Sequence, residues 1–140
     1  MSAIILSGKA IAEAIKAEVR NEVADLSEIH SVKPCLAVVR VGDDPASAVY
    51  VGSKVRTCEE LGMTSEHRHL DAGASQEEVM AAVDEFNSRT DVDGILVQLP
   101  LPKHIDERAI LERVDPLKDV DGFHPMNSGR LMQGRESLVP

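Results

Sequence analysis

The sequence predicts an α/β domain with three layers, in which a mainly parallel sheet lies between two layers of helices. Two short, strongly apolar runs, Cys35–Val39 and Gly94–Gln98, are typical of strands that are buried on both faces. Segments with helical periodicity or helix-capping residues alternate with them along the chain. Such alternation indicates βαβ units, whose helices cover both faces of a parallel sheet. A length of 140 residues suits one domain with its own core.

Four helices are predicted from these signals. Apolar residues spaced three and four apart predict the first, because this spacing places them on one face. Asp44 is a good N-cap and Pro45 suits the first helical position, so they open the second. Ser75–Glu78 matches a capping box and opens the third. The expected ranges are about 8–29, 45–61, 75–87 and 107–113.

The predicted order of elements also indicates where a ligand would bind. A weaker third strand is expected over residues 63–70, and a polar loop is expected after residue 113. In parallel α/β sheets, ligands bind beyond the carboxyl ends of the strands. Three segments are expected at that edge: Arg40–Pro45, Gln98–Pro102 and Lys118–Phe123. We therefore expect one cleft that is built from three distant parts of the chain.

Composition excludes several classes of function. The net charge of −9 argues against a nucleic-acid binder, which needs a basic face. No apolar run approaches the roughly 20 residues that span a bilayer, and no signal peptide is evident, so a cytoplasmic location without membrane contact is expected. Cys35 and Cys58 form no metal-binding pattern and are expected to be buried thiols.

One stripe of the second predicted helix carries reactive side chains. Ser47, Tyr50 and Lys54 are spaced by three and four residues, which places them within about 60° of one another on the helix. A lysine in a cleft can act in acid–base chemistry when it loses its water shell. On spacing alone, a solvated lysine on an exposed helix is the more common case.

Two further segments could contact a ligand. Gln98 ends a strongly apolar strand, where its amide could bind a ligand or Lys54, or could fix the Leu99–Pro102 turn. Asp119 and Asp121 lie in an Asp-Gly segment. A carboxylate there could accept two N–H groups from an amino-pyrimidine edge, or the segment could be an ordinary turn. It lacks the remaining positions of a calcium loop.

Other motifs that carry chemistry are missing from the sequence. His67 and His69 share one face of the weak strand, but without further metal ligands nearby they are interpreted as structural. The same interpretation holds for the isolated His30, His104 and His124. The chain has no glycine-rich nucleotide-phosphate loop and no nucleophile elbow. No metal or nucleotide site is therefore expected within it.

Three long motifs resemble a known family. Val41–Lys54, Asp93–Pro102 and Pro116–Phe123, which Asn127–Leu131 continues, are similar to the conserved stretches of bifunctional methylenetetrahydrofolate dehydrogenase/methenyltetrahydrofolate cyclohydrolase. They occur in the family's order and spacing, and the resemblance spans essentially the whole chain.

The resemblance implies roles for individual residues. Lys54 matches the family's catalytic lysine, Gln98 the glutamine that hydrogen-bonds it, and Tyr50 the tyrosine that stacks on or orients the folate. Asp121 matches the aspartate that holds the pterin. The catalytic group implied is therefore Lys54, Gln98 and Tyr50. The substrate-binding group implied is Tyr50, Val51, Gly52, Ser53, Lys54, Val97, Gln98, Leu99 and Asp121.

The resemblance also implies a larger parent enzyme. Residues 1–140 match the tetrahydrofolate-binding catalytic domain, which is the N-terminal half of a two-domain enzyme, and the NADP-binding Rossmann domain is absent from this chain. The parent is expected to be a homodimer that oxidises 5,10-methylenetetrahydrofolate with NADP and hydrolyses 5,10-methenyltetrahydrofolate to 10-formyltetrahydrofolate. The chain alone is expected to lack dehydrogenase activity. A non-enzymatic folate-binding or regulatory module, or an unrelated α/β interaction domain, is the alternative.

Overall fold

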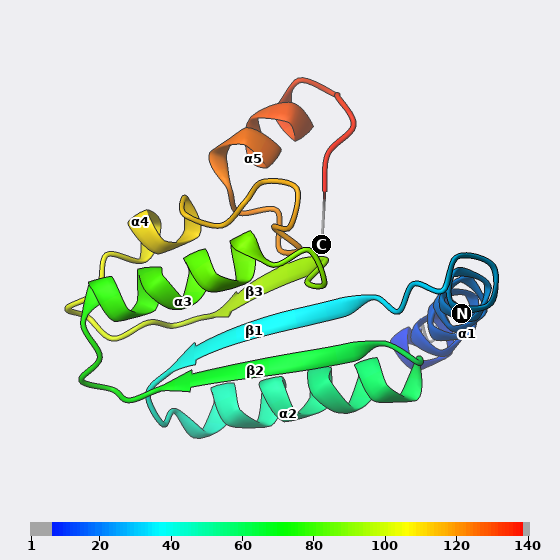
Figure 1. Ribbon diagram of the computed structural model, residues 1–140, viewed down its shortest axis with the longest axis horizontal. Coiled ribbons are helices and arrows are strands. Elements are labelled where there is room, and N and C mark those ends of the chain that lie inside the picture. The colour runs from blue at the N-terminus through cyan, green and yellow to red at the C-terminus, as the bar shows by residue number, and fades with distance from the viewer. Residues whose placement is uncertain (1–6, 139–140) are drawn as a thin grey trace, which may run out of the picture.

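A parallel sheet of three strands forms the centre of the fold. The computed structural model describes residues 7–138. The strands are β1 (Cys35–Val41), β2 (Thr64–Leu70) and β3 (Gly94–Gln98), in the spatial order β2-β1-β3. Because β1 is paired along its length with both neighbours, all three carboxyl ends lie at the same edge of the sheet (Figure 1).

Helices cover both faces of this sheet. They are α1 (Gly8–His30), α2 (Pro45–Glu60), α3 (Gln76–Ser88), α4 (Glu107–Leu111) and α5 (Pro125–Met132). Figure 1 shows α2 on one face, α3 and α4 on the other, α1 near the amino ends of the strands, and α5 standing away from the sheet. The predicted three-layer α/β fold is confirmed.

Two hydrophobic clusters bury the sheet, one on each face. The larger lies under α3 and α4, and includes Val39, Phe86, Ile95 and Ile110, all almost fully buried. The smaller lies under α2 and centres on Val38, Val51 and Leu96. Alternate residues of a strand point to opposite faces, so neighbouring residues of β1 serve different clusters. These contacts fix the position of α2 over the strands.

Three predicted boundaries were wrong. β1 continues to Val41 rather than ending at Val39, so Arg40 belongs to the strand and not to the loop after it. α4 ends at Leu111 rather than Arg113. The polar loop expected after residue 113 contains α5, which begins at Pro125 after the N-cap His124, whose Nδ1 accepts from the amide of Met126. A short helix with few buried residues gives little periodic signal.

The segment from Lys118 to Asp121 lies along the free edge of β3. The amide of Ile95 donates to the carbonyl of Lys118 over 2.7 Å, and Asp119 forms a parallel bridge with Ile95. Gly94 permits this approach, because a Cβ built there would lie 2.5 Å from Cγ1 of Val120. The segment is therefore attached to the sheet at the strand that carries Gln98.

Lys118 ties the same segment to the end of α3. Its Nζ donates to the carbonyls of Phe86, Asn87 and Arg89 over 3.2, 3.0 and 2.6 Å. A lysine at these carbonyls replaces hydrogen bonds that the end of a helix lacks, and it suits the negative end of the helix dipole.

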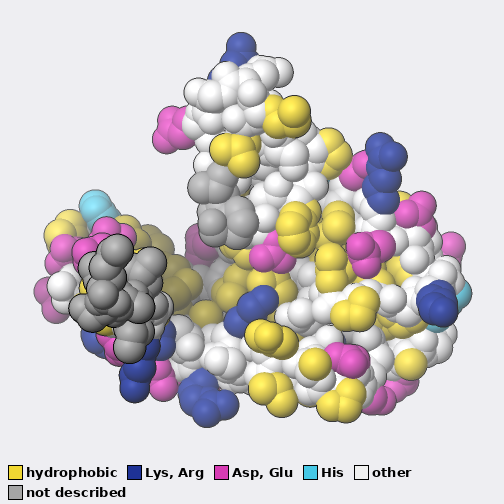
Figure 2. Space-filling model, turned by 180° about the vertical axis from the view of Figure 1, so that it is seen from behind, with side chains coloured by type: hydrophobic (Ala, Val, Ile, Leu, Met, Phe, Trp, Pro, Cys, Tyr) yellow, Lys and Arg dark blue, Asp and Glu magenta, His cyan; other side chains and the backbone are white. Residues whose placement is uncertain are grey.

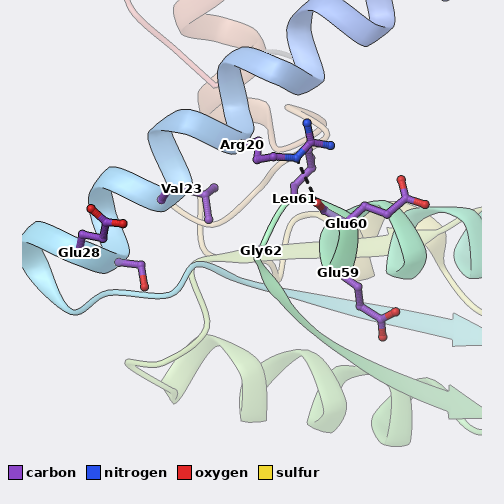
Figure 3. A pocket seen from close by; sticks show the side chains of 9 residues that line it. Arg20, Val23, Glu28, Glu59, Glu60, Leu61 and Gly62 are labelled. Carbon is purple, nitrogen blue, oxygen red and sulfur yellow. Dashed lines mark hydrogen bonds between the residues drawn. The ribbon is translucent and has the colours of Figure 1, made fainter.

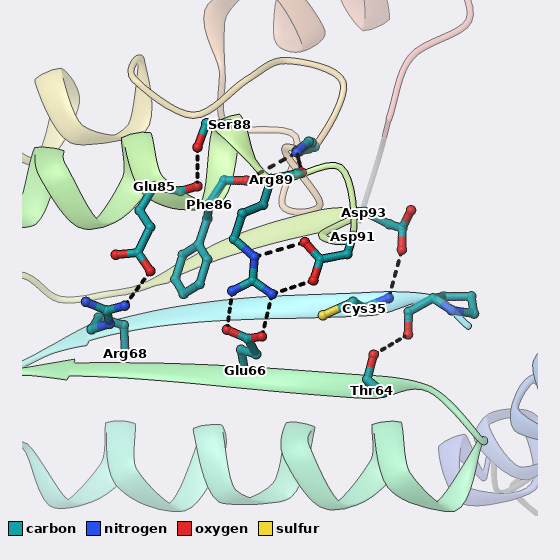
Figure 4. A network of polar contacts seen from close by, with 12 residues as sticks. Cys35, Thr64, Glu66, Arg68, Glu85, Phe86, Ser88, Arg89, Asp91 and Asp93 are labelled. Atoms are coloured by element: carbon teal, nitrogen blue, oxygen red, sulfur yellow. Dashed lines mark hydrogen bonds and ion pairs between the residues drawn. The ribbon is translucent and has the colours of Figure 1, made fainter. Parts of the chain in front are cut away.

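Near the amino ends of the strands, ion pairs connect the end of α3 to β2, and a side-chain hydrogen bond connects Asp93 to β1. Arg89 binds both carboxylate oxygens of Glu66 on β2 and also binds Asp91. Asp93 accepts from the amide of Cys35 over 2.9 Å (Figure 4). Because the pairs of Arg89 are accessible to water, each is expected to add little to stability.

The apolar stripe of α1 is mostly exposed. The predicted helix is confirmed, and Val23 on the stripe is buried, whereas Ile11 and Ile15 are 60% and 53% exposed. Further large hydrophobic side chains are exposed on α5, among them Leu131 and Met132. In Figure 2, hydrophobic side chains lie in the hollow beside α1 and on the projecting C-terminal part of the chain.

Replacing Gly94 tests the attachment of the Lys118–Asp121 segment. Gly94→Ala is expected to lower the free energy of unfolding by about 1–3 kcal/mol, because the added methyl group overlaps Val120 and must displace it. Urea denaturation measures the change. Gly73→Ala is the matched control, since a Cβ at Gly73 meets no atom within 4 Å. Equal stability of the two variants would show that the close approach is not a constraint.

Candidate functional site

The N-terminus of α2 lies at the carboxyl edge of the sheet, because α2 begins shortly after β1 ends. Asp44 accepts from the amide of Ser47 over 2.7 Å, which confirms the predicted N-cap. Ser47 is buried, and its hydroxyl lies 3.5 Å from the carbonyl of Leu99, just after β3. Ser47 therefore ties the start of α2 to the exit of β3.

Lys54 and Gln98 meet across this junction. Lys54 Nζ lies 3.5 Å from Gln98 Oε1, a long hydrogen bond. The amide nitrogen of Gln98 donates to the carbonyl of Leu99 over 2.8 Å, and this bond turns the amide oxygen toward the lysine. Gln98 thus fixes the Leu99 turn and faces Lys54, while its contact with a ligand stays a prediction.

A small cavity along α2 contains Tyr50 and Lys54. Its volume is about 260 Å³, and its lining consists of Leu36, Tyr50, Ser53, Lys54, Thr57 and Cys58. The side chain of Tyr50 is 64% exposed, and Lys54 is half-buried. An exposed phenol ring beside a half-buried amine gives a flat aromatic surface that leads to a polar group. Solvent exposure therefore varies along the predicted stripe: Ser47 is buried, Lys54 is half-buried and Tyr50 is exposed.

The two aspartates of the Lys118–Gly122 segment have different environments. Asp119 is 5% exposed and accepts from the amides of Phe123 and His124 and from Nδ2 of Asn127. Its carboxylate is therefore used within the chain, to shape the turn and start α5. Asp121 is half-buried, and within residues 7–138 its carboxylate forms no hydrogen bond or ion pair.

The charges around Asp121 connect it to Lys54. Burial raises the pKa of the Asp121 carboxyl, because water stabilises the charged form poorly there. The nearby Lys54 ammonium lowers the same pKa, and the negative charge of Asp119 raises it. Lys54, Gln98 and Asp121, which come from three distant segments, thus lie at one edge of the sheet.

Four of the predicted substrate-binding residues differ in how far they can reach this site. The side chains of Val51 and Val97 are buried in the core, on opposite faces of the sheet, so only their backbone could approach a ligand. Gly52 lines a different cavity, on the other side of α2. Leu99 is half-buried and contributes its carbonyl to the contacts of Ser47 and Gln98.

Sequence reasoning missed the residues that position Asp121. Lys118 fixes one end of its segment, and Asn127 donates to both Pro116 and Asp119 over 2.8 and 3.0 Å. Asn127 is 2% exposed, which is unusual for an amide and shows that its partners are part of the fold. A polar motif that continues into residues 127–131 was the available signal.

A further cavity lies away from these residues. It has a volume of about 420 Å³ between α1 and the end of α2, near the amino ends of the strands (Figure 3). Glu28, Glu59 and Glu60 line it, and Arg20 donates to the carbonyl of Glu60 over 3.3 Å. Although this cavity is larger than the one at Lys54, it contains none of the predicted site residues.

Residues 7–138 also contain possible metal ligands and two cysteines. Within residues 7–138, no three His, Cys, Asp or Glu side chains lie close enough to hold a metal ion. Cys35 and Cys58 are both buried, as predicted, and burial raises the pKa of the Cys58 thiol. In the same range, no helix has the length and hydrophobicity that a membrane span requires.

Comparison with known proteins identifies a group of similar sequences. The family described as tetrahydrofolate dehydrogenase/cyclohydrolase, catalytic domain, matches residues 6–121. The bifunctional protein FolD of Halalkalibacterium halodurans is 48% identical over all 140 residues, which cover 50% of that protein. FolD 2 of Roseobacter denitrificans is 50% identical over the same length, which covers 47% of it. The chain thus spans about half the length of the curated relatives it matches.

Solved structures show the same fold. The bifunctional FolD methylenetetrahydrofolate dehydrogenase/cyclohydrolase of Campylobacter jejuni superposes with a TM-score of 0.91 at 46% identity, covering 94% of this chain and 46% of that one. The FolD of Trypanosoma brucei, solved with NADP cofactor and an inhibitor, gives a TM-score of 0.94 at 33% identity, covering 99% and 48%.

Because the pKa of Asp121 is raised, ionisation of this carboxyl is expected to lower the stability of the folded state. The folded state holds this proton more tightly than the unfolded chain, so stability falls as pH rises above the ordinary value of 3.8 and through the raised pKa. Asp121→Asn removes this cost. The variant is therefore expected to be more stable than the parent at neutral pH, and the difference should disappear in acid below 3.8.

Urea denaturation across this pH range measures the effect. Asp25→Asn, on the exposed side of α1, controls for the loss of one negative charge. A gain in stability for Asp121→Asn that is the same at every pH would contradict the assignment of the cost to this carboxylate.

Proposed function

Because the chain belongs to the tetrahydrofolate dehydrogenase/cyclohydrolase family, we propose that it is the folate-binding catalytic domain of an enzyme of one-carbon metabolism. The whole protein, in this proposal, oxidises 5,10-methylenetetrahydrofolate with NADP and hydrolyses 5,10-methenyltetrahydrofolate to 10-formyltetrahydrofolate. The observation that carries the proposal is the contact of Lys54 with Gln98 beside Asp121, at the edge of the sheet where ligands bind.

The hydrolysis needs a group that moves protons at the folate carbon. The oxygen of water bonds to the electrophilic methenyl carbon, the electron pair of the C=N bond moves to nitrogen, and Lys54 accepts the proton of water. The hydroxyl proton of the adduct is then transferred to N5 while the C–N5 bond breaks, which leaves the formyl group on N10. The proton on Lys54 passes to solvent, so one proton is released per turnover.

The remaining residues hold the substrate and the lysine in place. Gln98 Oε1 accepts from Lys54 and keeps the amine aimed at the reacting carbon, because the other end of the amide is fixed on Leu99. Asp121 accepts N–H groups from the pterin. Tyr50 stacks on the flat part of the folate through its exposed ring. Positioning of this kind supplies much of the rate that an active site gains.

Residues 7–138 of this chain do not form a recognisable binding site for NADP. The sequence has no glycine-rich phosphate loop, and the relatives are about twice as long. We assign the binding of NADP to a Rossmann domain of the parent protein, where the cofactor would supply the hydride acceptor for the oxidation. We also infer that the parent is a cytoplasmic homodimer whose partners are small folates rather than nucleic acid or membranes.

Replacing Lys54 tests the proton-transfer role. Lys54→Met in the full-length enzyme is expected to slow methenyltetrahydrofolate hydrolysis by about 10²–10⁴-fold, since general acid–base catalysis contributes on that order. Loss of methenyl absorbance measures the rate. Lys33→Met, an exposed change before β1, is the matched control. Near-normal hydrolysis by Lys54→Met would remove Lys54 from the mechanism and favour a folate-binding module without catalysis here.

Replacing Asp121 separates binding from chemistry. Asp121→Ala is expected to weaken folate binding by about 10–100-fold, because a hydrogen bond to a charged group contributes about 1.5–3 kcal/mol. Calorimetry measures the affinity, and turnover at saturating folate should change much less. Asp115→Ala, a carboxylate at the other end of the same loop, is the control. Unchanged affinity with a large loss of turnover would contradict the binding role.

A further inference from the structure

Arg40 is a buried cation that forms no direct ion pair with the nearby Asp44, whose carboxyl pKa is lowered by the hydrogen bonds from Ser47 and, less strongly, by the charge of Arg40. It lies on β1 with only 9% of its surface exposed, on the sheet face that α2 covers. Its Nε is buried without a hydrogen-bond acceptor. Among residues 7–138, no carboxylate forms an ion pair with it. A buried charge is normally paired, because removing it from water costs on the order of several kcal/mol. The missing ion pair of Arg40 therefore requires an explanation.

Within residues 7–138, the hydrogen-bond partner of the Arg40 guanidinium is the ring of His69. Nη2 lies 3.2 Å from Nδ1 and 3.1 Å from Nε2 of His69. Nε2 of the same ring lies 3.0 Å from the carbonyl of Gly42 and 3.3 Å from a carboxylate oxygen of Asp43, and both are acceptors. The Arg40 guanidinium therefore lies against the edge of the His69 ring, within hydrogen-bond distance of both ring nitrogens. This contact fixes the arginine in place but supplies no negative charge to balance it.

A cavity opens beside Arg40 on the side of α2 that faces β2. We call it the Arg40 cavity. It has a volume of about 280 Å³, and its lining consists of Arg40, Ala48, Val51, Gly52, Val55 and His67. It shares no residue with the cavity at Lys54. Two of the α2 residues in the wall are very small, and a Cβ built on Gly52 meets no atom within 4 Å, so the wall leaves open space.

We propose that the Arg40 cavity binds a small oxyanion, a phosphate or carboxylate group, between Arg40 and His67. Such a group supplies the acceptors and the negative charge that the guanidinium lacks, and arginine binds oxyanions through parallel hydrogen bonds. The ring N–H of His67 donates a further hydrogen bond to the oxyanion.

The surroundings of His67 agree with an anion at this position. Burial lowers the pKa of its ring, and the positive charge of Arg40 lowers it further. Its ring is stacked on that of His69, with centroids 6.1 Å apart. A bound anion would offset the charge of Arg40 and compensate the burial of the ring. The site is separate from the proposed folate site, so either assignment can fail while the other stands.

Titration with inorganic phosphate, and separately with acetate, tests the proposal. NMR of the protein is expected to show saturable shifts of the Arg40 Nε–H and the His67 ring signals. Saturation by phosphate alone assigns the site to phosphate groups, and saturation by acetate assigns it to carboxylates. Failure of both anions to saturate these signals would overturn the proposal.

Variants on either side of the cavity make the test specific. Arg40→Met is expected to weaken anion binding by at least about tenfold, whereas Arg56→Met, an exposed arginine on α2, should leave it unchanged. If Arg40→Met unfolds, Ala48→Leu serves instead, because it fills the cavity from the exposed side of α2 and retains Arg40. Binding that persists in folded Arg40→Met or in Ala48→Leu would place the anion elsewhere and overturn the proposal.

Discussion

Parallel pairing of β1 with both of its neighbours is the constraint on which the rest of the structure depends. Because the three strands run in the same direction, the segments that follow them all leave the sheet at one edge. The start of α2, the Leu99 turn and the attached segment at Asp121 meet there. The packing of Val51 on Val38 and Leu96 sets the height of α2 over the strands. Lys54 consequently reaches Gln98 although the two residues are far apart in the sequence.

The same helix forms the wall of two unrelated cavities. Residues 50, 53, 54, 57 and 58 line the cavity at Lys54, and residues 48, 51, 52 and 55 line the Arg40 cavity. This division follows from helical periodicity, since residues three and four apart share a face. One flank of α2 therefore carries an amine near a carboxylate, and the other covers an arginine. Their chemistry differs although the backbone that supports them is shared.

How far the sequence predicted the structure depended on the range of each interaction. α2, its Asp44 cap and the strand at Gly94 were predictable, because capping and apolar runs are local signals. Lys54 and Gln98 were identified as candidates by spacing and position, and the family resemblance added Asp121. The burial of Arg40 was not predictable, because it depends on His69, a partner on another strand. The clamp by Lys118 likewise joins residues about 30 positions apart.

The contact between Lys54 and Gln98 spans 44 residues of chain, and this distance links ligand binding to the cooperativity of folding. No fragment that lacks the sheet can present both groups, so a partly unfolded chain has no affinity for a ligand that needs them together. Such a ligand stabilises the native state by mass action. Its effect on amide hydrogen exchange would therefore extend to the slowest amides of β1, far from the ligand, rather than stopping at the residues that it contacts.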